Sequence, residues 1–301
     1  IKCFGHHSIP HRPVARMPDP DVESGTIICF GASLFMRRFI LATLLLMLPA
    51  AIHAQVTVLV HGHLSSGETW ARHGILGTLA LDGWGYGGHL FTNRAIPGNA
   101  PRYAKTVYTA NLLSTAPLPN QAATLRQQLL AVQRRHPGEE IILVGHSAGG
   151  VVARLLLVEY GPQQVTRLIT IASPHIGTPR AARGLEITED HGPPIETVKR
   201  VVGGNDYRGA KKSRQLYREL LPGNRASVLD WLNRQEHPPI EYISVIRVPG
   251  VGSKGDRVVP VYSQDMNMIP VLYGRASSFT TPGDHYLKPF DGLLIARLLA
   301  E

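Results

Sequence analysis

The sequence is almost free of cysteine: it holds only Cys3 and Cys29. This excludes a disulfide scaffold, a thiolate metal site and a cysteine nucleophile from everything after residue 29. Long basic runs are also missing, since no run exceeds two residues. The net charge is nevertheless +9, from 31 Lys and Arg against 22 Asp and Glu. We therefore expect a diffusely basic protein that does not bind nucleic acid.

The N-terminal apolar stretch is too short to be an ordinary membrane span. Residues 36–38 read Met-Arg-Arg, and residues 39–54 carry no charge, include Pro49 and end on Ala54. A positive start, an apolar stretch and a small final residue are typical of a secretory signal peptide. A spanning helix needs about 20 apolar residues. We predict a signal peptide over 36–54 and a secreted or periplasmic protein; an uncleaved N-terminal anchor is the alternative.

The segment before that signal has no pattern of its own. Residues 1–35 are rich in His, Pro and Gly and precede a methionine that begins a complete signal. We interpret them as a non-native upstream extension. The remaining residues, 55–301, suffice for one domain with a large buried core.

Short apolar runs rich in β-branched residues alternate with helical patterns in residues 55–301. This alternation predicts an α/β fold, with a mostly parallel sheet of about six strands flanked by helices. Several strands are apolar at consecutive positions, which indicates that helices cover both faces. We expect strands at 56–60, 106–110, 141–144, 168–171, 242–248 and 277–280, and helices at 71–81, 120–135, 149–160 and 289–299.

A glycine-rich turn links one predicted strand to one predicted helix. Residues 141–150 read IILVGHSAGG, which places Ser147 between Gly145 and Gly149. Glycines two residues either side let the chain bend sharply, so that the serine hydroxyl projects above the sheet. The helix that follows points its N-terminal amides toward developing negative charge. We therefore predict that Ser147 is a nucleophile.

Three segments together carry a family resemblance. Residues 58–62 (VLVHG), the turn around Ser147, and residues 172–179 (ASPHIGTP) resemble the α/β-hydrolase superfamily, above all bacterial lipases and lipase-like serine esterases. The resemblance covers nearly all of residues 55–301. It implies the α/β-hydrolase fold and a catalytic triad in the chain order serine, acid, histidine. Some bacterial lipases carry a structural calcium, but no clear ligand set is visible, and we predict neither a metal nor a cofactor.

One histidine occupies the position that the triad requires. His285 is the only histidine after His237, and it lies between the last predicted strand and the closing helix. We predict that it takes the proton of the Ser147 hydroxyl. His61 and His175 lie in loops typical of the family, where we expect them to brace structure. The other histidines are scattered, which disfavours a zinc site.

The acid must follow the strand at 242–248. Asp256, Asp265 and Asp284 lie between this strand and His285. Asp284 is adjacent to the histidine and fits a turn former better. Asp256 comes first, in a Gly-Asp-Arg-Val-Val-Pro stretch that is similar to the acid loop of the family. We predict that Asp256 orients the imidazole; a simple turn at a loop tip is the alternative.

An oxyanion hole needs two amides. We expect them from Ala148, directly after the nucleophile, and from the backbone of His63, without a role for its imidazole. The helix at 71–81 is expected to pack over this loop. Glycine-rich residues 83–88 lack the Lys-Ser/Thr of a phosphate-binding loop and follow no predicted strand, so we interpret them as a flexible loop near the rim of the site.

Residues 176–239 are far longer than an ordinary loop between strands. Helical patterns at 210–221 and 226–234 predict a mostly helical cap or lid, with Leu216, Leu220 and Trp231 in the acyl pocket. Its basic residues would face water or an anionic membrane surface. Packing of the same apolar faces on the core, without movement, is the alternative.

These features predict a serine carboxylic-ester hydrolase of lipase type, which works through an acyl-enzyme on Ser147. The substrate would be a small-molecule or lipid ester. An amidase, thioesterase or acyltransferase would use the same triad. A non-catalytic binding protein on this fold is a further alternative. The acyl chain length, the leaving group and the oligomeric state do not follow from the sequence.

Overall fold

A sheet of parallel strands is the central feature of the computed structural model, which describes residues 55–189, 208–250 and 254–300. By its internal contacts the chain divides at residue 51, and all described residues belong to the second unit, Ile52–Glu301. The predicted extension at 1–35 and signal peptide at 36–54 lie outside the described residues. Within these limits the sheet has seven strands in the order β2-β3-β1-β4-β5-β6-β7. They are β1 (Gln55–Val60), β2 (Gly85–Leu90), β3 (Lys105–Ala110), β4 (Glu140–His146), β5 (Val165–Ile171), β6 (Glu241–Val248) and β7 (Ala276–Pro282).

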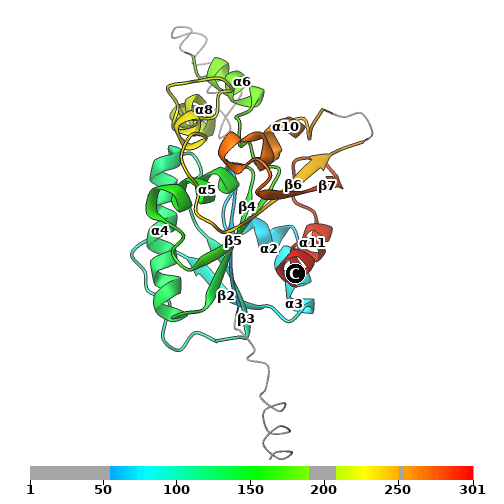
Figure 1. The fold of residues 1–301 in the computed structure, drawn as a ribbon. Helices are drawn as coiled ribbons and strands as arrows, with labels where there is room; N and C mark the ends of the chain where they lie inside the picture. The colour runs from blue at the N-terminus through cyan, green and yellow to red at the C-terminus, as the bar shows by residue number, and fades with distance from the viewer. Residues whose placement is uncertain (1–54, 190–207, 251–253, 301) are drawn as a thin grey trace, which may run out of the picture. The chain divides into compact units, whose positions relative to one another are not determined.

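Helices cover both faces of this sheet, as predicted (Figure 1). Helices α4 (Leu118–Arg135) and α5 (Ala148–Tyr160) lie on one face, and α2 (Thr69–Arg72), α3 (Ile75–Leu81) and α11 (Pro289–Ala300) on the other. Alternate strand residues supply two apolar clusters: Val58 belongs to the cluster under α4 and α5, and Leu59 to the cluster under α3 and α11. Buried parallel strands need apolar residues on both faces, which explains the continuous apolar runs.

Residues 85–88 of the glycine-rich segment 83–88, which we interpreted as a flexible loop, lie in strand β2, so that prediction was wrong. β2 pairs in parallel with β3 at the edge of the sheet, with an irregularity between Tyr86 and Gly88. Its glycines make room for aromatic rings: a Cβ at Gly85 would lie 2.0 Å from Tyr103, and one at Gly87 2.3 Å from Tyr108. Glycine ordinarily weakens a strand, so local propensity hid this seventh strand.

The parallel arrangement gathers four loops at one edge of the sheet. Loops at the carboxyl ends of β1, β4, β6 and β7 carry His61, Ser147, Asp256 and His285. β4 is central and pairs with β1 and β5, and β6 pairs with β7. Open α/β sheets bind ligands beyond the carboxyl ends of their strands, so this edge is where a site is expected.

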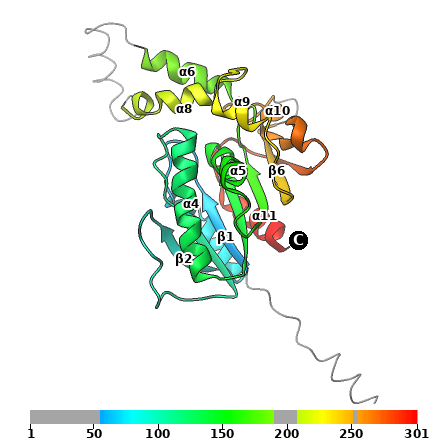
Figure 2. The same ribbon diagram turned by 60° about the vertical axis from the view of Figure 1, so that its left-hand side comes forward.

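All regular secondary structure that the structure describes between β5 and β6 is helical. This segment contains α6 (Pro179–Thr188), α8 (Arg214–Glu219) and α9 (Val228–Leu232), while residues 190–207 lie outside the described residues. These helices lie beyond the carboxyl edge of the sheet (Figure 2). Short helices after β6, including α10 (Val261–Gln264), complete this end. Nowhere in the described ranges is a helix both long and apolar enough to span a membrane.

Candidate active site

The turn after β4 holds Ser147 in a conformation that side chains rarely adopt. Its φ and ψ are 54° and −131°, and its amide donates a hydrogen bond to the carbonyl oxygen of Ile171 at 2.9 Å. The flanking glycines also allow other backbone segments to approach closely. A Cβ at Gly145 would lie 2.4 Å from the Cα of Gly150, and one at Gly149 would lie 2.4 Å from the carbonyl oxygen of His61. Such stored backbone strain is typical of functional sites.

The loop after β1 lies directly against this turn. A Cβ at Gly62 would come within 2.8 Å of the Ser147 Cβ. His61 is buried, donates from Nδ1 to the Gly62 carbonyl oxygen at 3.0 Å, and accepts at Nε2 from the Leu112 amide at 3.1 Å. Burial lowers the pKa of His61, so the neutral ring is favoured. The imidazole braces the loop, as we expected.

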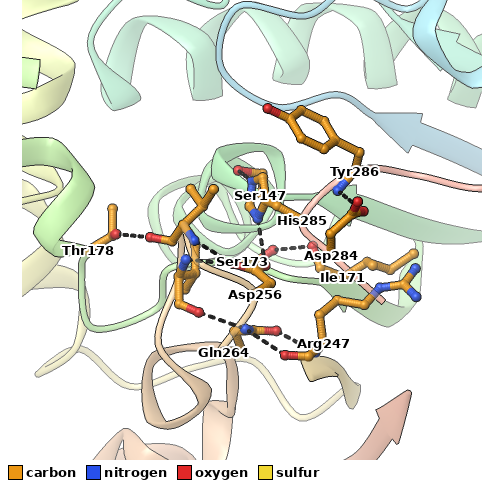
Figure 3. Close-up of polar contacts among 12 residues, drawn as sticks. Ser147, Ile171, Ser173, Thr178, Arg247, Asp256, Gln264, Asp284, His285 and Tyr286 are labelled. Carbon is orange, nitrogen blue, oxygen red and sulfur yellow. Dashed lines mark hydrogen bonds and ion pairs between the residues drawn. The ribbon is translucent and has the colours of Figure 1, made fainter. Parts of the chain in front are cut away.

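Ser147, His285 and Asp256 form one chain of hydrogen bonds (Figure 3). His285 Nε2 lies 2.9 Å from the Ser147 hydroxyl oxygen, and His285 Nδ1 lies 2.6 Å from Asp256 Oδ2. An ionised carboxylate can only accept, so Nδ1 carries the proton and Nε2 is left to accept from the serine hydroxyl. This arrangement can remove a proton from Ser147 and hold the resulting imidazolium beside a negative charge.

Backbone amides fix the carboxylate of Asp256 in place. Its other oxygen, Oδ1, accepts hydrogen bonds from Val258 at 2.9 Å and Val259 at 2.7 Å, and the residue is 1% exposed. Arg257, between Asp256 and Val258, has a φ of 71°, in the left-handed region. The loop thus bends back so that its amides meet the side chain of its own aspartate, as in an Asx-turn.

The two rival carboxylates have other partners. Asp265 Oδ1 accepts from the Asn267 amide at 2.9 Å and from the Ser278 hydroxyl at 2.6 Å. Asp284 accepts from the Tyr286 amide at 3.2 Å and forms an exposed ion pair with Lys288 at 3.3 Å. Of the three candidates for the acid, Asp256 is the one that is hydrogen-bonded to the His285 ring.

Two buried side chains that the sequence analysis did not single out hold the loops of this site. Gln264 Oε1 accepts from the Arg247 amide at 2.7 Å, and Gln264 Nε2 donates to the Val259 carbonyl oxygen at 2.9 Å, which ties the end of β6 to the acid loop (Figure 3). The Arg247 guanidinium forms a buried ion pair with Asp291 and lies 3.4 Å from the Pro282 carbonyl oxygen. Arg247 therefore supports the loops of both Asp256 and His285.

The two residues expected to supply the amides of an oxyanion hole follow the neighbouring strands β1 and β4. Ala148 is the first residue of α5, so its amide is among the N-terminal groups that lack an acceptor within the helix. His63 follows the loop at Gly62, and its ring has a contact that we did not foresee. His63 Nε2 lies 2.7 Å from the Ser213 hydroxyl, and the ring packs edge-on against Tyr217. Burial lowers the pKa of His63 to about 4. The imidazole thus links this loop to the cap.

The three residues predicted to bind substrate occupy different environments. Leu216 and Leu220 are buried in the same apolar cluster as Val58, and Trp231 is 41% exposed. The structure therefore places both leucines in the packing of the cap on the core. A role in binding substrate stays a prediction for all three.

His175 is the other histidine for which we expected a structural role. His175 is buried and its Nε2 lies 3.1 Å from the Thr170 hydroxyl, in the bracing role that we expected. Within the parts of the chain that the structure describes, no cluster of three or more His, Cys, Asp or Glu side chains could hold a metal ion.

Known proteins match this chain in segments. Residues 105–188 match the PGAP1-like alpha/beta domain. The GPI inositol-deacylase of Debaryomyces hansenii is 39% identical over 70 residues, which are 23% of this chain and 7% of that protein. The GPI inositol-deacylase of Coccidioides immitis is 29% identical over 173 residues, 54% of this chain and 12% of that protein. The chain thus spans only a small part of the length of these relatives.

A solved structure matches over a longer stretch. The mature form of the Bacillus licheniformis lipase BlEst2 superposes with a TM-score of 0.57 and 16% identity, over 82% of this chain and 91% of the lipase. At 16% sequence identity, this similarity is evidence for a shared fold alone. It agrees with the seven-stranded parallel sheet. The chain thus has the fold of the α/β hydrolases.

Proposed function

We propose that this protein is a serine hydrolase of carboxylic esters. Ser147 would be the nucleophile, His285 the general base and Asp256 the residue that orients the imidazole. The observation that carries the proposal is the continuous path of hydrogen bonds from the Ser147 hydroxyl through His285 to Asp256, at 2.9 and 2.6 Å. Burial of Asp256 strengthens the last link, because the carboxylate has little competition from water.

The reaction would have two halves that share one set of groups. His285 Nε2 takes the hydroxyl proton while Ser147 Oγ bonds to the ester carbonyl carbon, whose π electrons move to the carbonyl oxygen. The amides of Ala148 and His63 would stabilise that oxyanion, together with the N-terminal dipole of α5. The carbon–oxygen bond to the alcohol then breaks, and His285 returns its proton to the alcohol. Water repeats the sequence on the acyl-enzyme and frees the acid and Ser147.

We further propose a lipid-type ester as the substrate. Two relatives are named GPI inositol-deacylase, and the similar structure is named a lipase. An amide or a thioester would react through the same groups, as would transfer of the acyl group to an acceptor other than water. Secretion or export to the periplasm, contact with a membrane surface, and a single domain over 55–301 are further parts of this proposal.

The test is hydrolysis of p-nitrophenyl esters from acetate to palmitate by the wild-type protein and Ser147→Ala. We expect the variant to lose activity by at least about 1,000-fold, since the nucleophile acts as one unit with its base. A fluorophosphonate probe should label the wild-type protein at Ser147 and leave Ser147→Ala unlabelled. Undiminished hydrolysis by a correctly folded variant would exclude the mechanism. Comparison of matched ester, thioester and amide substrates then decides the bond class.

A further inference from the structure

Four cationic side chains surround a pocket beside the acid loop. The pocket has a volume of about 320 Å³, which is at the small end of the range for ligand sites. Two of the cations, Arg180 and Arg183, come from α6, and two, Lys254 and Arg257, come from the loop that carries Asp256. The Thr178 hydroxyl donates to the Val258 carbonyl oxygen, so a hydrogen bond ties the two walls together (Figure 3).

No carboxylate balances this charge among the described residues that line the pocket. All four cations are exposed, and none is in an ion pair with another residue that the structure describes. The Asp256 carboxylate is turned away, toward His285. Like charges around one hollow repel each other and concentrate a positive potential there, so an anion that enters would be attracted by all four.

A second pocket adjoins the first, and its lining is mostly apolar rather than cationic. It has a volume of about 650 Å³ and shares Lys254 and Pro260 with the basic pocket. Its other lining residues are mostly apolar, with Tyr262 48% and Met268 53% exposed. The one carboxylate in this lining, Asp265, is already engaged by Asn267 and Ser278. A cationic hollow beside an apolar one matches a ligand with an anionic head and an apolar tail.

We propose that the two pockets together bind an anionic lipid. The phosphate of the head group would lie among Arg180, Arg183, Lys254 and Arg257, and the aliphatic part would lie over Tyr262 and Met268. Binding does not require hydrolysis, so the proposal goes beyond the esterase function and can be tested without it. The bound lipid would lie against the acid loop, whose inner side holds His285 through Asp256.

The experiment measures binding to vesicles of pure phosphatidylcholine and to vesicles that also contain phosphatidylglycerol. Arg180→Gln/Arg183→Gln removes two charges from the basic pocket. Arg134→Gln/Arg225→Gln removes two exposed charges that line neither pocket, and so controls for net charge. We expect the wild-type protein to bind phosphatidylglycerol vesicles at least tenfold more tightly than phosphatidylcholine alone. The pocket variant should lose at least about tenfold of that affinity and the control less than about twofold, since an arginine attracts an anionic surface only locally.

Two further measurements, one with inorganic phosphate and one with Met268→Ser, test binding of the anionic head group and of the apolar tail separately. Calorimetry should detect weak phosphate binding in the wild-type protein that Arg180→Gln/Arg183→Gln abolishes. Met268→Ser should weaken vesicle binding and leave phosphate binding unchanged. Equal losses in the two double variants would overturn the proposal in favour of unspecific attraction by net charge. Phosphate binding without any preference for phosphatidylglycerol, or vesicle binding indifferent to Met268→Ser, would overturn the assignment to a lipid.

Discussion

His146 Nε2 donates a hydrogen bond to the backbone carbonyl oxygen of His285, at 2.8 Å. The residue just before the strained serine therefore holds the backbone of the residue whose ring contacts that serine. The two rings lie 5.2 Å apart between centroids. Burial lowers the pKa of His146 to about 3, so its ring stays neutral and Nε2–H remains a donor near neutral pH. His146 is a positioning residue, since it acts through His285.

Loss of this donor should impair turnover more than binding. In His146→Leu the carbonyl oxygen of His285 lacks its partner, at a cost of about 1–3 kcal/mol, and the loop can shift. We expect kcat to fall about 10- to 100-fold with KM within about twofold. His146→Gln can donate from its amide and should recover part of the loss. Steady-state kinetics over a range of pH check this; equal kcat in His146→Leu and the wild-type protein would remove His146 from the positioning of the base.

The orientation of the imidazole gives a second prediction. Asp256→Asn keeps the shape of the side chain but replaces one carboxylate oxygen by an NH₂ group. This NH₂ group must face either Nδ1 of His285 or the amides of Val258 and Val259, and all of these are donors themselves. The favoured imidazole tautomer is then wrong, which in a serine triad costs up to about 10⁴-fold in kcat. We expect a loss of about 10²- to 10⁴-fold in p-nitrophenyl ester hydrolysis. Asp265→Asn is the matched control, and a comparable loss there would contradict the assignment of the acid.

Two helical glycines should respond in opposite ways to the same substitution. Gly149→Ala would bring a Cβ within 2.4 Å of the His61 carbonyl oxygen, whereas no atom lies within 4 Å of a Cβ at Gly77. Overpacking of this kind costs about 1–3 kcal/mol, and alanine in an open helical position gains about 0.5–1 kcal/mol. Thermal unfolding should thus show a lower Tm for Gly149→Ala and a higher one for Gly77→Ala. A rise in Tm for both would mean that the approach at Gly149 is not close.

Acid should destabilise the fold through its buried histidines. Burial lowers the pKa of His146 to about 3 and those of His63 and His237 to about 4, against 6.5 for an unhindered histidine. Between about pH 6.5 and these lowered values the unfolded chain binds protons that the folded one does not. The free energy of unfolding therefore falls as pH drops through this window, by up to about 1.4 kcal/mol per pH unit for each histidine.

Urea unfolding at pH 7.5, 6, 5 and 4 measures this slope, and His237→Gln should make it shallower. Glu219 opposes the trend, because burial raises the pKa of its carboxyl group. A free energy of unfolding that stays level or rises toward pH 4 would show that these histidines are protonated in the folded protein.

The contacts of the cap predict a static element. Leu216 and Leu232 are fully buried, and Glu219 Oε2 accepts from the amide of Leu118 at 2.7 Å, at the start of α4. Buried Arg154 of α5 donates to Asn233, just after α9, at 2.5 Å. We expect hydrolysis rates of a long-chain ester to saturate smoothly as its concentration passes from monomers to micelles. A jump in rate at the micellar transition would instead require that these contacts open.

The sequence by itself determined the class of fold and the residues of the candidate triad. Both rest on local patterns. Consecutive apolar positions in β4 predict a buried strand, and the glycines around Ser147 predict a sharp turn. The chain order of Ser147, Asp256 and His285 follows from the order of the strands.

Tertiary structure decided the contacts between segments far apart in the chain. Local patterns did not predict β2, because its glycines leave space for the rings of Tyr103 and Tyr108, and this packing is not visible in the local sequence. The hydrogen bond from His146 to His285 spans 139 positions, and that from His63 to Ser213 spans 150. The four cations beside the acid loop meet only because α6 packs against residues 254–260. Periodicity and propensity report the neighbours of a residue along the chain, whereas these features depend on which surfaces pack together.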